Sequence, residues 1–317
     1  MRILLVRLDG IGDAAVCVPL IAALREAGHD VGVALTTRNA GLFSPNAIVA
    51  QHVLERIPWP AHGSTPESTA RAAAEIAATR YDVALVASEE PEAFALAAPV
   101  PERVGFTTGW ARPLKTLWVR ARTTRTVSRS QRIGREDAHE VEVMYRLGAG
   151  LVREPKPPAD RERLRDVLAI EETDPFGGGE LPCIIVQAGP KWASSGVAPD
   201  TLRAVVARLA PYASIVAAPG EAEAVRELTG IVPRTYPTLG AWVRALGFAN
   251  LVVSVDTGAA HVAGMLSLRV VDVFPDAHFE AQVRRWRPWA SPYRAFRASE
   301  VDGGPHSRFI EAVLDGF

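Results

Sequence analysis

The sequence predicts an α/β protein with two Rossmann-like halves, and three observations support that prediction. Short runs rich in Val, Ile and Leu alternate with segments of helical period, first over residues 1–150 and again from residue 183. Strands without polar alternation are typical of parallel sheets that helices cover on both faces. A stretch over 153–182, rich in Pro, Gly and charge, separates the two series, and 317 residues suffice for two domains.

The elements of the first half are inferred from apolar runs and from the residues that end helices and strands. Gly28 ends the first helix, and an Ala-rich composition favours the second. Strands are expected at Arg2–Leu8, Val31–Thr36 and Asp82–Ala87, and helices at Asp13–Ala27, within Ser64–Arg80 and over about Asp137–Gly148.

The second half repeats the pattern after one short helix, Arg161–Ala169, in the linker. Strands are expected at Cys183–Gln187, Ser214–Ala218, Leu251–Val255 and Val270–Phe274, and helices at Pro199–Leu209, Glu221–Thr229, Leu239–Gly247 and His306–Leu314. The expected organisation is an N-terminal Rossmann-like domain over 1–155, a linker over 156–182, a C-terminal Rossmann-like domain over 183–304 and a C-terminal helix over 305–317. Packing of that last helix on the N-terminal domain is left open.

Composition excludes several classes of protein. Hydrophobic residues make up 48% of the chain, and 35 Lys and Arg balance 36 Asp and Glu, so the whole molecule is no general polyanion binder. No apolar run approaches the ~18 residues of a membrane span, and Arg7 and Asp9 break the first run. Cys17 and Cys183 are expected to be buried thiols in a reducing compartment. We therefore expect a cytoplasmic protein.

The turn after the first strand, DGIGDAA over 9–15, matches the G-x-G-x-x-A spacing of a dinucleotide site. An NAD(P) enzyme is therefore a legitimate alternative. Asp13 argues against it, because a carboxylate at the helix start would repel a pyrophosphate. The second strand also ends in Thr36-Thr37-Arg38, without an acidic residue for a ribose hydroxyl. Asp13 is either a helix cap or a general base, kept ionised by the helix N-terminus, at the edge where open α/β sheets bind ligands.

The stretch LVVSVDTGAAHVAGM, over Leu251–Met265, is the most informative part of the chain. A buried strand ends in Asp256-Thr257-Gly258, and small residues with His261 then open a helix. Such a turn exposes backbone N–H groups that bind phosphate, and glycine allows a close approach. Asp256 and Thr257 are also ordinary capping residues.

Taken together, the first 25 residues, MRILLVRLDGIGDAAVCVPLIAALR, and the downstream block VSVDTGAAHVAGMLSLRVVDVF resemble glycosyltransferase family 9, the ADP-heptose:lipopolysaccharide heptosyltransferases. The likeness covers nearly the whole chain in family order. Supporting matches are Asp137-Ala138-His139-Glu140, Lys191-Trp192 and Trp286-Arg287-Pro288-Trp289. Two blocks depart from the family: Ala193–Ala198 lies between Lys191-Trp192 and the next helix, and Pro275-Asp276-Ala277-His278 replaces a Gly-x-Thr loop.

The resemblance implies a GT-B fold, in which two Rossmann-like domains with parallel sheets face a central cleft, the domain over 1–155 binding the acceptor and the domain over 183–304 binding the nucleotide-sugar donor. It implies inverting, metal-independent transfer of a sugar, heptose from ADP-heptose by family expectation, with the nucleotide sugar as co-substrate and no cofactor. Asp13 matches the proposed catalytic base. The donor diphosphate would contact Lys191, Asp256, Thr257, Gly258 and His261. Glu221, Glu223 and Leu239 are candidates for the donor nucleoside.

From Arg103 to Arg135 the chain carries nine Lys or Arg and no Asp or Glu, with Trp110 and Trp118 interleaved. Such a run is either a solvated face or a surface for an anionic partner. No nucleic-acid motif accompanies it. An anionic glycan or glycolipid such as lipopolysaccharide inner core is the favoured acceptor, with peripheral contact at the membrane surface left open. Candidate acceptor contacts are Arg112, Lys115, Arg120 and Arg122. The alternatives are an NAD(P) oxidoreductase, a nucleotide-sugar epimerase, or an inactive GT-B protein that binds nucleotide or glycan.

Overall fold

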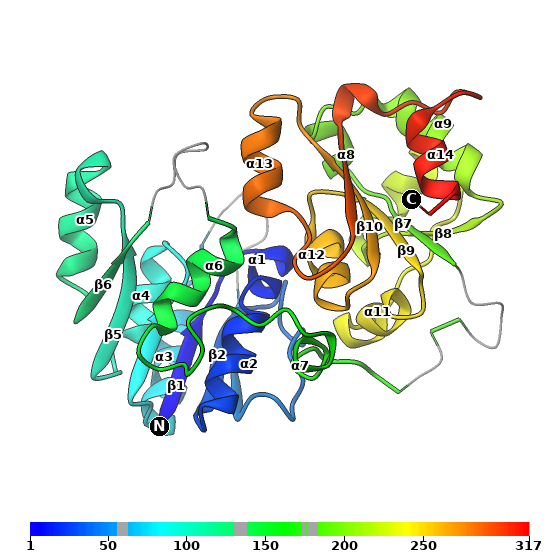
Figure 1. Ribbon diagram of the computed structural model, residues 1–317. Helices are drawn as coiled ribbons and strands as arrows, with labels where there is room; N and C mark the ends of the chain where they lie inside the picture. The colour runs from blue at the N-terminus through cyan, green and yellow to red at the C-terminus, as the bar shows by residue number, and fades with distance from the viewer. Residues whose placement is uncertain (56–62, 130–137, 173–174, 177–182, 317) are drawn as a thin grey trace. The chain divides into compact units, whose positions relative to one another are not determined.

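The computed structural model describes residues 1–55, 63–129, 138–172, 175–176 and 183–316, and the chain divides into two compact units, Met1–Ala169 and Ile170–Phe317. Each unit contains one sheet whose strands pair in parallel, with helices packed against it (Figure 1). The boundary falls inside the predicted linker, and the short helix α7 (Arg161–Arg165) belongs to unit 1. The central cleft stays a prediction.

Unit 1 has a six-stranded sheet in the order β3-β2-β1-β4-β5-β6. The strands are β1 (Arg2–Val6), β2 (Asp30–Thr36), β3 (Ala50–Leu54), β4 (Val83–Val86), β5 (Glu102–Thr107) and β6 (Arg125–Ser128). The central strands are fully covered: Ile3, Leu4, Leu5 and Val6 are buried along β1, as expected for a parallel sheet between two helical layers.

The helices of unit 1 are α1 (Ile11–Ala15), α2 (Val18–Glu26), α3 (Pro66–Thr79), α4 (Pro91–Ala97), α5 (Pro113–Arg120), α6 (Glu140–Tyr145) and α7, with 3-10 turns η1 (Gly109–Ala111) and η2 (Arg146–Gly148). Leu4 and Val6 of β1 belong to the core that includes residues of α3, α4 and α5. Helix α2 contacts α6 and α7. Gly148 lets α2 approach closely, since a Cβ there would lie 2.5 Å from Leu20 Cδ1.

The first predicted helix, Asp13–Ala27, is wrong as a single element, because α1 ends at Ala15 and α2 begins at Val18. Pro19 explains the break: its ring has no N–H to donate to the Ala15 carbonyl and would clash with that group in a continuous helix. Three strands of unit 1, β3, β5 and β6, were not predicted. The chain from Arg103 to Arg129, considered only as a basic run, forms β5, α5 and β6, and β6 is a polar edge strand.

Unit 2 has a five-stranded sheet in the order β11-β10-β9-β7-β8. The strands are β7 (Ile184–Gln187), β8 (Ala213–Val216), β9 (Leu251–Val255), β10 (Arg269–Phe274) and β11 (Tyr293–Arg297). The helices are α8 (Lys191–Ser194), α9 (Pro199–Leu209), α10 (Ala222–Thr229), α11 (Leu239–Leu246), α12 (Gly258–Met265), α13 (Phe279–Trp286) and α14 (Arg308–Leu314), with 3-10 turns η3 (Pro219–Glu221) and η4 (Ala298–Glu300). The four predicted strands are confirmed, whereas the polar edge strand β11 was not predicted.

Strand alternation divides the interior of unit 2 into two faces. Val253 and Val255 of β9, with Val271 and Val273 of β10, pack in one core with residues of α9, α10 and α14. The residue between the two valines of each strand points to the opposite face of the sheet. Ser254 and Asp272 are register partners on that opposite face, and α12 contacts both strands.

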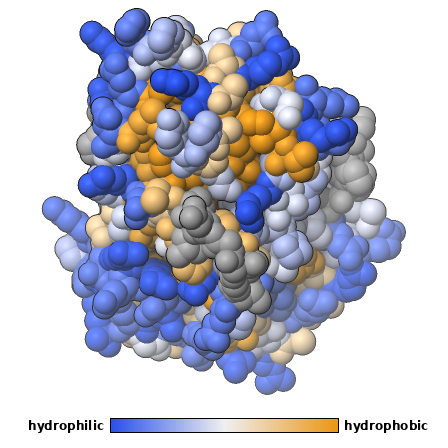
Figure 2. Space-filling view, turned by 90° about the vertical axis from the view of Figure 1, so that its right-hand side faces the viewer, coloured by the Kyte–Doolittle hydropathy of each residue, from blue (hydrophilic) through white to orange (hydrophobic). Residues whose placement is uncertain are grey.

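One of the two cysteine thiols differs from its expected burial. Cys17 is buried as predicted, but Cys183 is exposed, because it precedes β7 and lies outside the covered part of the sheet. Figure 2 shows apolar surface among hydrophilic residues on one face of the molecule. Among the described residues, none of the helices has the length and apolar character needed to cross a bilayer.

Candidate functional site

The strand order reverses at one place in each sheet, and both places carry polar residues. In unit 1, β1 lies between β2 and β4, and in unit 2, β7 lies between β8 and β9. At such a switch point the connections leave to opposite faces, which opens a crevice at the carboxyl ends of the strands where α/β proteins bind ligands. The segments that follow these strands are therefore two candidate sites, one within each unit, and each is called the half-site of its unit.

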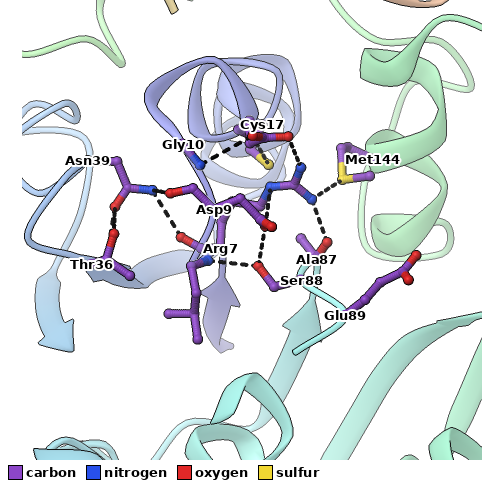
Figure 3. A network of polar contacts seen from close by, with 12 residues as sticks. Arg7, Asp9, Gly10, Cys17, Thr36, Asn39, Ala87, Ser88, Glu89 and Met144 are labelled. Carbon is purple, nitrogen blue, oxygen red and sulfur yellow. Dashed lines mark hydrogen bonds and ion pairs between the residues drawn. The ribbon is translucent and has the colours of Figure 1, made fainter. Parts of the chain in front are cut away.

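In unit 1 the half-site is organised around Arg7, which directly follows β1 (Figure 3). Its side chain is only 4% exposed, and its Nη2 lies 2.6 Å from Asp13 Oδ1. Its Nε lies 3.2 Å from Asp9 Oδ2, and Nη1 donates to the Ala87 carbonyl. Burial alone would lower the pKa of Arg7, but Asp13 and Asp9 outweigh burial, so the pKa is raised and the guanidinium stays charged.

Asp13 has the capping role, one of the two that the sequence left open, and its role as a general base stays a prediction. Its Oδ2 accepts from the Gly10 N–H at 3.2 Å, which caps α1, and its Oδ1 accepts from Arg7. The side chain remains 34% exposed, so solvent and small ligands reach it. Because the Gly10 N–H already has this carboxylate as its acceptor, the turn is poorly suited to a dinucleotide pyrophosphate. A positioned, accessible carboxylate beside a cation is suited to accept a proton.

Neighbouring loops hold this arrangement from both sides. Ser88, just after β4, donates to Asp9 Oδ2 at 2.6 Å and accepts from the Leu8 N–H. The buried Asn39 amide donates to the carbonyls of Arg7 and Asp9. Burial raises the pKa of the nearby Cys17 thiol to about 12, so this thiol is neutral and is no nucleophile.

In unit 2 the half-site begins with Lys191, which opens α8 four residues after β7. Its neighbour Trp192 is 1% exposed and donates its indole N–H to the Gln187 carbonyl at 2.8 Å. The buried indole fixes the loop and leaves Lys191 at the surface. The Lys191 ammonium donates to the Asp256 carbonyl, so the structure brings Lys191 and the turn after β9 together.

The turn after β9 is built as a helix start. Thr257 is the N-cap of α12: its Oγ1 accepts from the Ala259 N–H and shares a 2.7 Å hydrogen bond with Ser254 Oγ. The first turn of a helix leaves N–H groups without an intrahelical acceptor. Gly258 and Ala260 therefore present their N–H groups near the Lys191 ammonium, a combination suited to phosphate.

His261 and Asp256 pair with each other at this turn. His261 Nε2 lies 3.3 Å from Asp256 Oδ1, and the ring is 4% exposed. The edge of Trp286 packs against the His261 ring at a centroid distance of 5.7 Å. The 288–289 segment packs closely on α12, because a Cβ at Gly264 would lie 2.8 Å from Trp289 N. The segment Trp286–Trp289 thus packs on His261 and α12 and so supports the turn that precedes this helix.

Asp272 lies beneath this turn and was not predicted to matter. It is completely buried, and its two oxygens have no hydrogen-bond partner of good geometry; the Val273 N–H offers only a weak one. Burial, with the negative charge of Asp256 adding to it, holds the pKa of Asp272 well above its usual value despite the opposing charge of Lys191. Asp272 is a buried acid that favours its neutral form.

The three nucleoside candidates differ in position. Glu221 lies against the backbone after β7, since a Cβ at Gly189 would lie 2.6 Å from Glu221 Oε2. Glu223 forms an ion pair with Arg226 on α10. Leu239 is half-buried at the start of α11, and Trp242 one turn later donates to Gln187 Oε1. Glu221 is therefore beside the half-site of unit 2, and α11 is hydrogen-bonded to the end of β7.

Several members of the basic segment have internal partners. Lys115 pairs with Glu89 just after β4, and Arg129 pairs with the fully buried Glu140. Arg122 stacks on Trp118, with its guanidinium carbon 4.1 Å from the ring centroid. Arg112 and Arg120 are exposed. Arg132, Arg135 and Asp137 of the predicted segments lie outside the described residues.

The residues that sequence reasoning missed share one signal, a charge inside or directly beside an apolar strand. Arg7 and Asp9 were noted only because they interrupt an apolar run, and Asp272 interrupts VVDVF. In a parallel sheet buried on both faces, such a residue must be buried and needs a partner. That rule would have identified Arg7 and Asp272.

Among the residues that the structure describes, no group of three or more His, Cys, Asp or Glu side chains is placed to hold a metal ion. This observation concerns protein ligands only, and the expectation of metal-independent chemistry stays a prediction.

Comparison with solved structures supports the fold. The chain resembles E. coli heptosyltransferase WaaC with ADP (19% identity, 100% of this chain and 98% of that chain, TM-score 0.67). It also resembles E. coli ADP-heptose lps heptosyltransferase II (14%, 100% and 99%, 0.69) and the glycosyl transferase family 9 structure from Veillonella parvula (15%, 93% and 85%, 0.67). No protein-family model and no curated protein matches the chain.

These structures confirm the likeness to glycosyltransferase family 9 and the α/β, GT-B fold expected from the sequence motifs. The identities are below one fifth, so the likeness establishes the fold alone.

Replacing Arg7 with Met should lower the free energy of unfolding by about 1.5–3 kcal/mol, because Asp9 and Asp13 would lose their hydrogen bonds to a buried cation while staying partly solvated. Urea denaturation measures this change. Arg203→Met is the matched control: its partner Asp200 is exposed, so the loss should stay below about 1 kcal/mol. Equal, small losses in both variants would show that Arg7 does not organise the half-site.

Asp272→Asn should change how stability depends on pH. The folded protein binds the Asp272 proton more tightly than the unfolded chain, so wild-type stability falls as pH rises above ~3.9 and through the raised folded pKa, by up to about 1.4 kcal/mol per pH unit. The Asn variant lacks this component. Its gain over wild type should be larger at about pH 8 than at about pH 4 in urea denaturation. The exposed Asp200→Asn is the control, and the idea fails if wild type and Asp272→Asn show the same pH slope.

Proposed function

We propose that this protein is an inverting, metal-independent glycosyltransferase that moves a sugar from a nucleotide diphosphate donor to an anionic glycan or glycolipid. The observation that carries the proposal is the composition of the two switch points: an accessible carboxylate held by a buried cation in unit 1, and a lysine beside a helix start in unit 2. Those are the groups that inverting transfer requires, a base for the acceptor and a cationic site for the leaving diphosphate.

The reaction assigns one task to each group. An acceptor hydroxyl oxygen attacks the anomeric carbon of the donor sugar, and its proton passes to Asp13. The bond from that carbon to the diphosphate oxygen breaks, and the diphosphate leaves with the electron pair. Lys191 and the N–H groups of Gly258 and Ala260 stabilise the charge that develops on the diphosphate. Arg7 is a positioning residue, because it acts through the Asp13 carboxylate.

The identity of the substrates rests on the resemblance. The E. coli structures are described as bound to ADP and to ADP-2-deoxy-2-fluoro heptose. We extend this to ADP-heptose as the donor here, with Glu221 beside the ribose and with Leu239 and Glu223 nearby. Lipopolysaccharide inner core is the proposed acceptor, which Arg112, Lys115, Arg120 and Arg122 would attract. We place the protein in the cytoplasm, at the inner face of the membrane.

Two isosteric or matched variants separate binding from chemistry. In a thermal-shift panel of ADP-, GDP- and UDP-sugars, an ADP-sugar should stabilise the wild type. Lys191→Ala should weaken that binding roughly 10- to 150-fold, which corresponds to the loss of a hydrogen bond to a charged group.

Asp13→Asn should bind the donor within about twofold of wild type yet transfer to lipopolysaccharide inner core about 10²- to 10⁴-fold more slowly.

Lys156→Ala, an exposed lysine of unit 1, is the control and should change neither property. The proposal fails if no nucleotide sugar stabilises the wild type while NADP does, which would favour the oxidoreductase. Full transfer by Asp13→Asn would remove the assigned base. Nucleotide binding without turnover in any variant, wild type included, would favour a binding protein.

A further inference from the structure

Helix α5 of unit 1 presents an apolar face to solvent, the reverse of an ordinary surface helix. Trp110 is 95% exposed, Leu114 81% and Leu117 62%, the largest cluster of exposed large hydrophobic side chains near one element. Leu114 and Leu117 are three residues apart and so lie on one side of α5, and Trp110 belongs to η1, the turn that directly precedes this helix. Exposed apolar clusters of this kind usually mark an interaction site.

The orientation of α5 is fixed from its other side. Val119 is buried in the unit 1 core, and the Trp118 ring packs edge-on against Phe94 at 4.9 Å. The helix contacts β5 (Figure 1). Rotating α5 to bury Leu114 and Leu117 would therefore expose Val119 and Thr116, which are buried, so the apolar face belongs to the native structure.

The surroundings of this face are positively charged. No Asp or Glu occurs from residue 103 to residue 135. Arg112 lies between Trp110 and Leu114 in sequence, and Arg120 lies one turn beyond Leu117; both are exposed. A partner must therefore offer an apolar layer and negative charge together.

We propose that this α5 surface, made of Trp110, Leu114, Leu117, Arg112 and Arg120, docks on an anionic lipid bilayer. A short amphipathic segment with Trp and Leu on one face and arginines beside them is suited to the headgroup boundary, where the indole favours the interface and each cation is attracted to anionic lipid. Because Lys115 of the same helix pairs with Glu89 beside the unit 1 switch point, docking also brings that edge to the lipid.

Membrane docking by α5 rests on the proposed placement at the inner face of the membrane, and it is tested without any donor or acceptor, so its failure would leave the proposed sugar transfer intact. Full-length protein is mixed with vesicles of phosphatidylcholine alone, or of equal parts phosphatidylcholine and phosphatidylglycerol, and the bound fraction is measured by sedimentation. Wild type should bind the anionic vesicles and bind neutral vesicles far more weakly. The triple variant Trp110→Ser, Leu114→Ser, Leu117→Ser should lose at least about tenfold in partitioning. Arg112→Gln with Arg120→Gln should lose roughly 25-fold, about fivefold for each arginine.

Two controls keep the outcome interpretable. Tyr212→Ser with Val232→Ser removes exposed apolar side chains of unit 2, 57% and 77% exposed, and should leave vesicle binding unchanged. All replaced residues are at the surface, so thermal melting should show native stability in each variant. Equal binding by the α5 variants and wild type overturns the proposal. So does a wild-type dimer, seen by sedimentation velocity, that the triple serine variant dissociates while no vesicle binding occurs, since the occupant would then be a second copy.

Discussion

Parallel strand pairing is the constraint on which the site depends. Every carboxyl end in such a sheet lies at one edge, and the connections reverse direction at one point only, between β1 and β4 in unit 1 and between β7 and β9 in unit 2. Asp9, Asp13 and Ser88 follow the strands at the first switch point. Lys191 and the Thr257 turn follow those at the second. The topology therefore gathers, within each unit, residues that are distant in sequence.

The two half-sites treat their cations differently, and the difference matches the chemistry proposed for each. The Arg7 guanidinium is buried and neutralised by Asp9 and Asp13, so it orients a carboxylate and has little charge left for a ligand. Lys191 is exposed, and its contact at the turn after β9 is to a neutral carbonyl, that of Asp256, so its positive charge remains available to a phosphate. The first arrangement suits proton transfer, and the second suits binding of a leaving diphosphate.

The sequence predicted most of the apolar strands and missed the edge strands β3, β6 and β11, together with β5, an inner strand that lies in the basic run. Strands β1, β2, β4, β7, β9 and β10 are apolar runs buried on both faces, so composition alone identifies them. The edge strands β3, β6 and β11 are partly exposed and carry polar residues, which removes that signal. Lys191 and the Asp256 turn were predicted as one cluster and do meet. The Arg7 network could not be read in full from spacing, because Ala87 and Ser88 join it from the end of β4, a strand paired with β1 through the sheet. The burial of Asp272 likewise depends on its place in the middle of the sheet.

Hydrogen–deuterium exchange of the intact protein with and without ADP tests the central claim, that the unit 2 switch point holds the donor diphosphate. The account predicts slower exchange in peptides covering Gly189–Trp192 and Thr257–His261, where the N–H groups of the helix start would gain an acceptor. Exchange in the turn over 9–15 should change little by comparison. Protection confined to the 9–15 turn, with none at Thr257–His261, would contradict the account and would move the nucleotide to the G-x-G-x-x-A turn of unit 1.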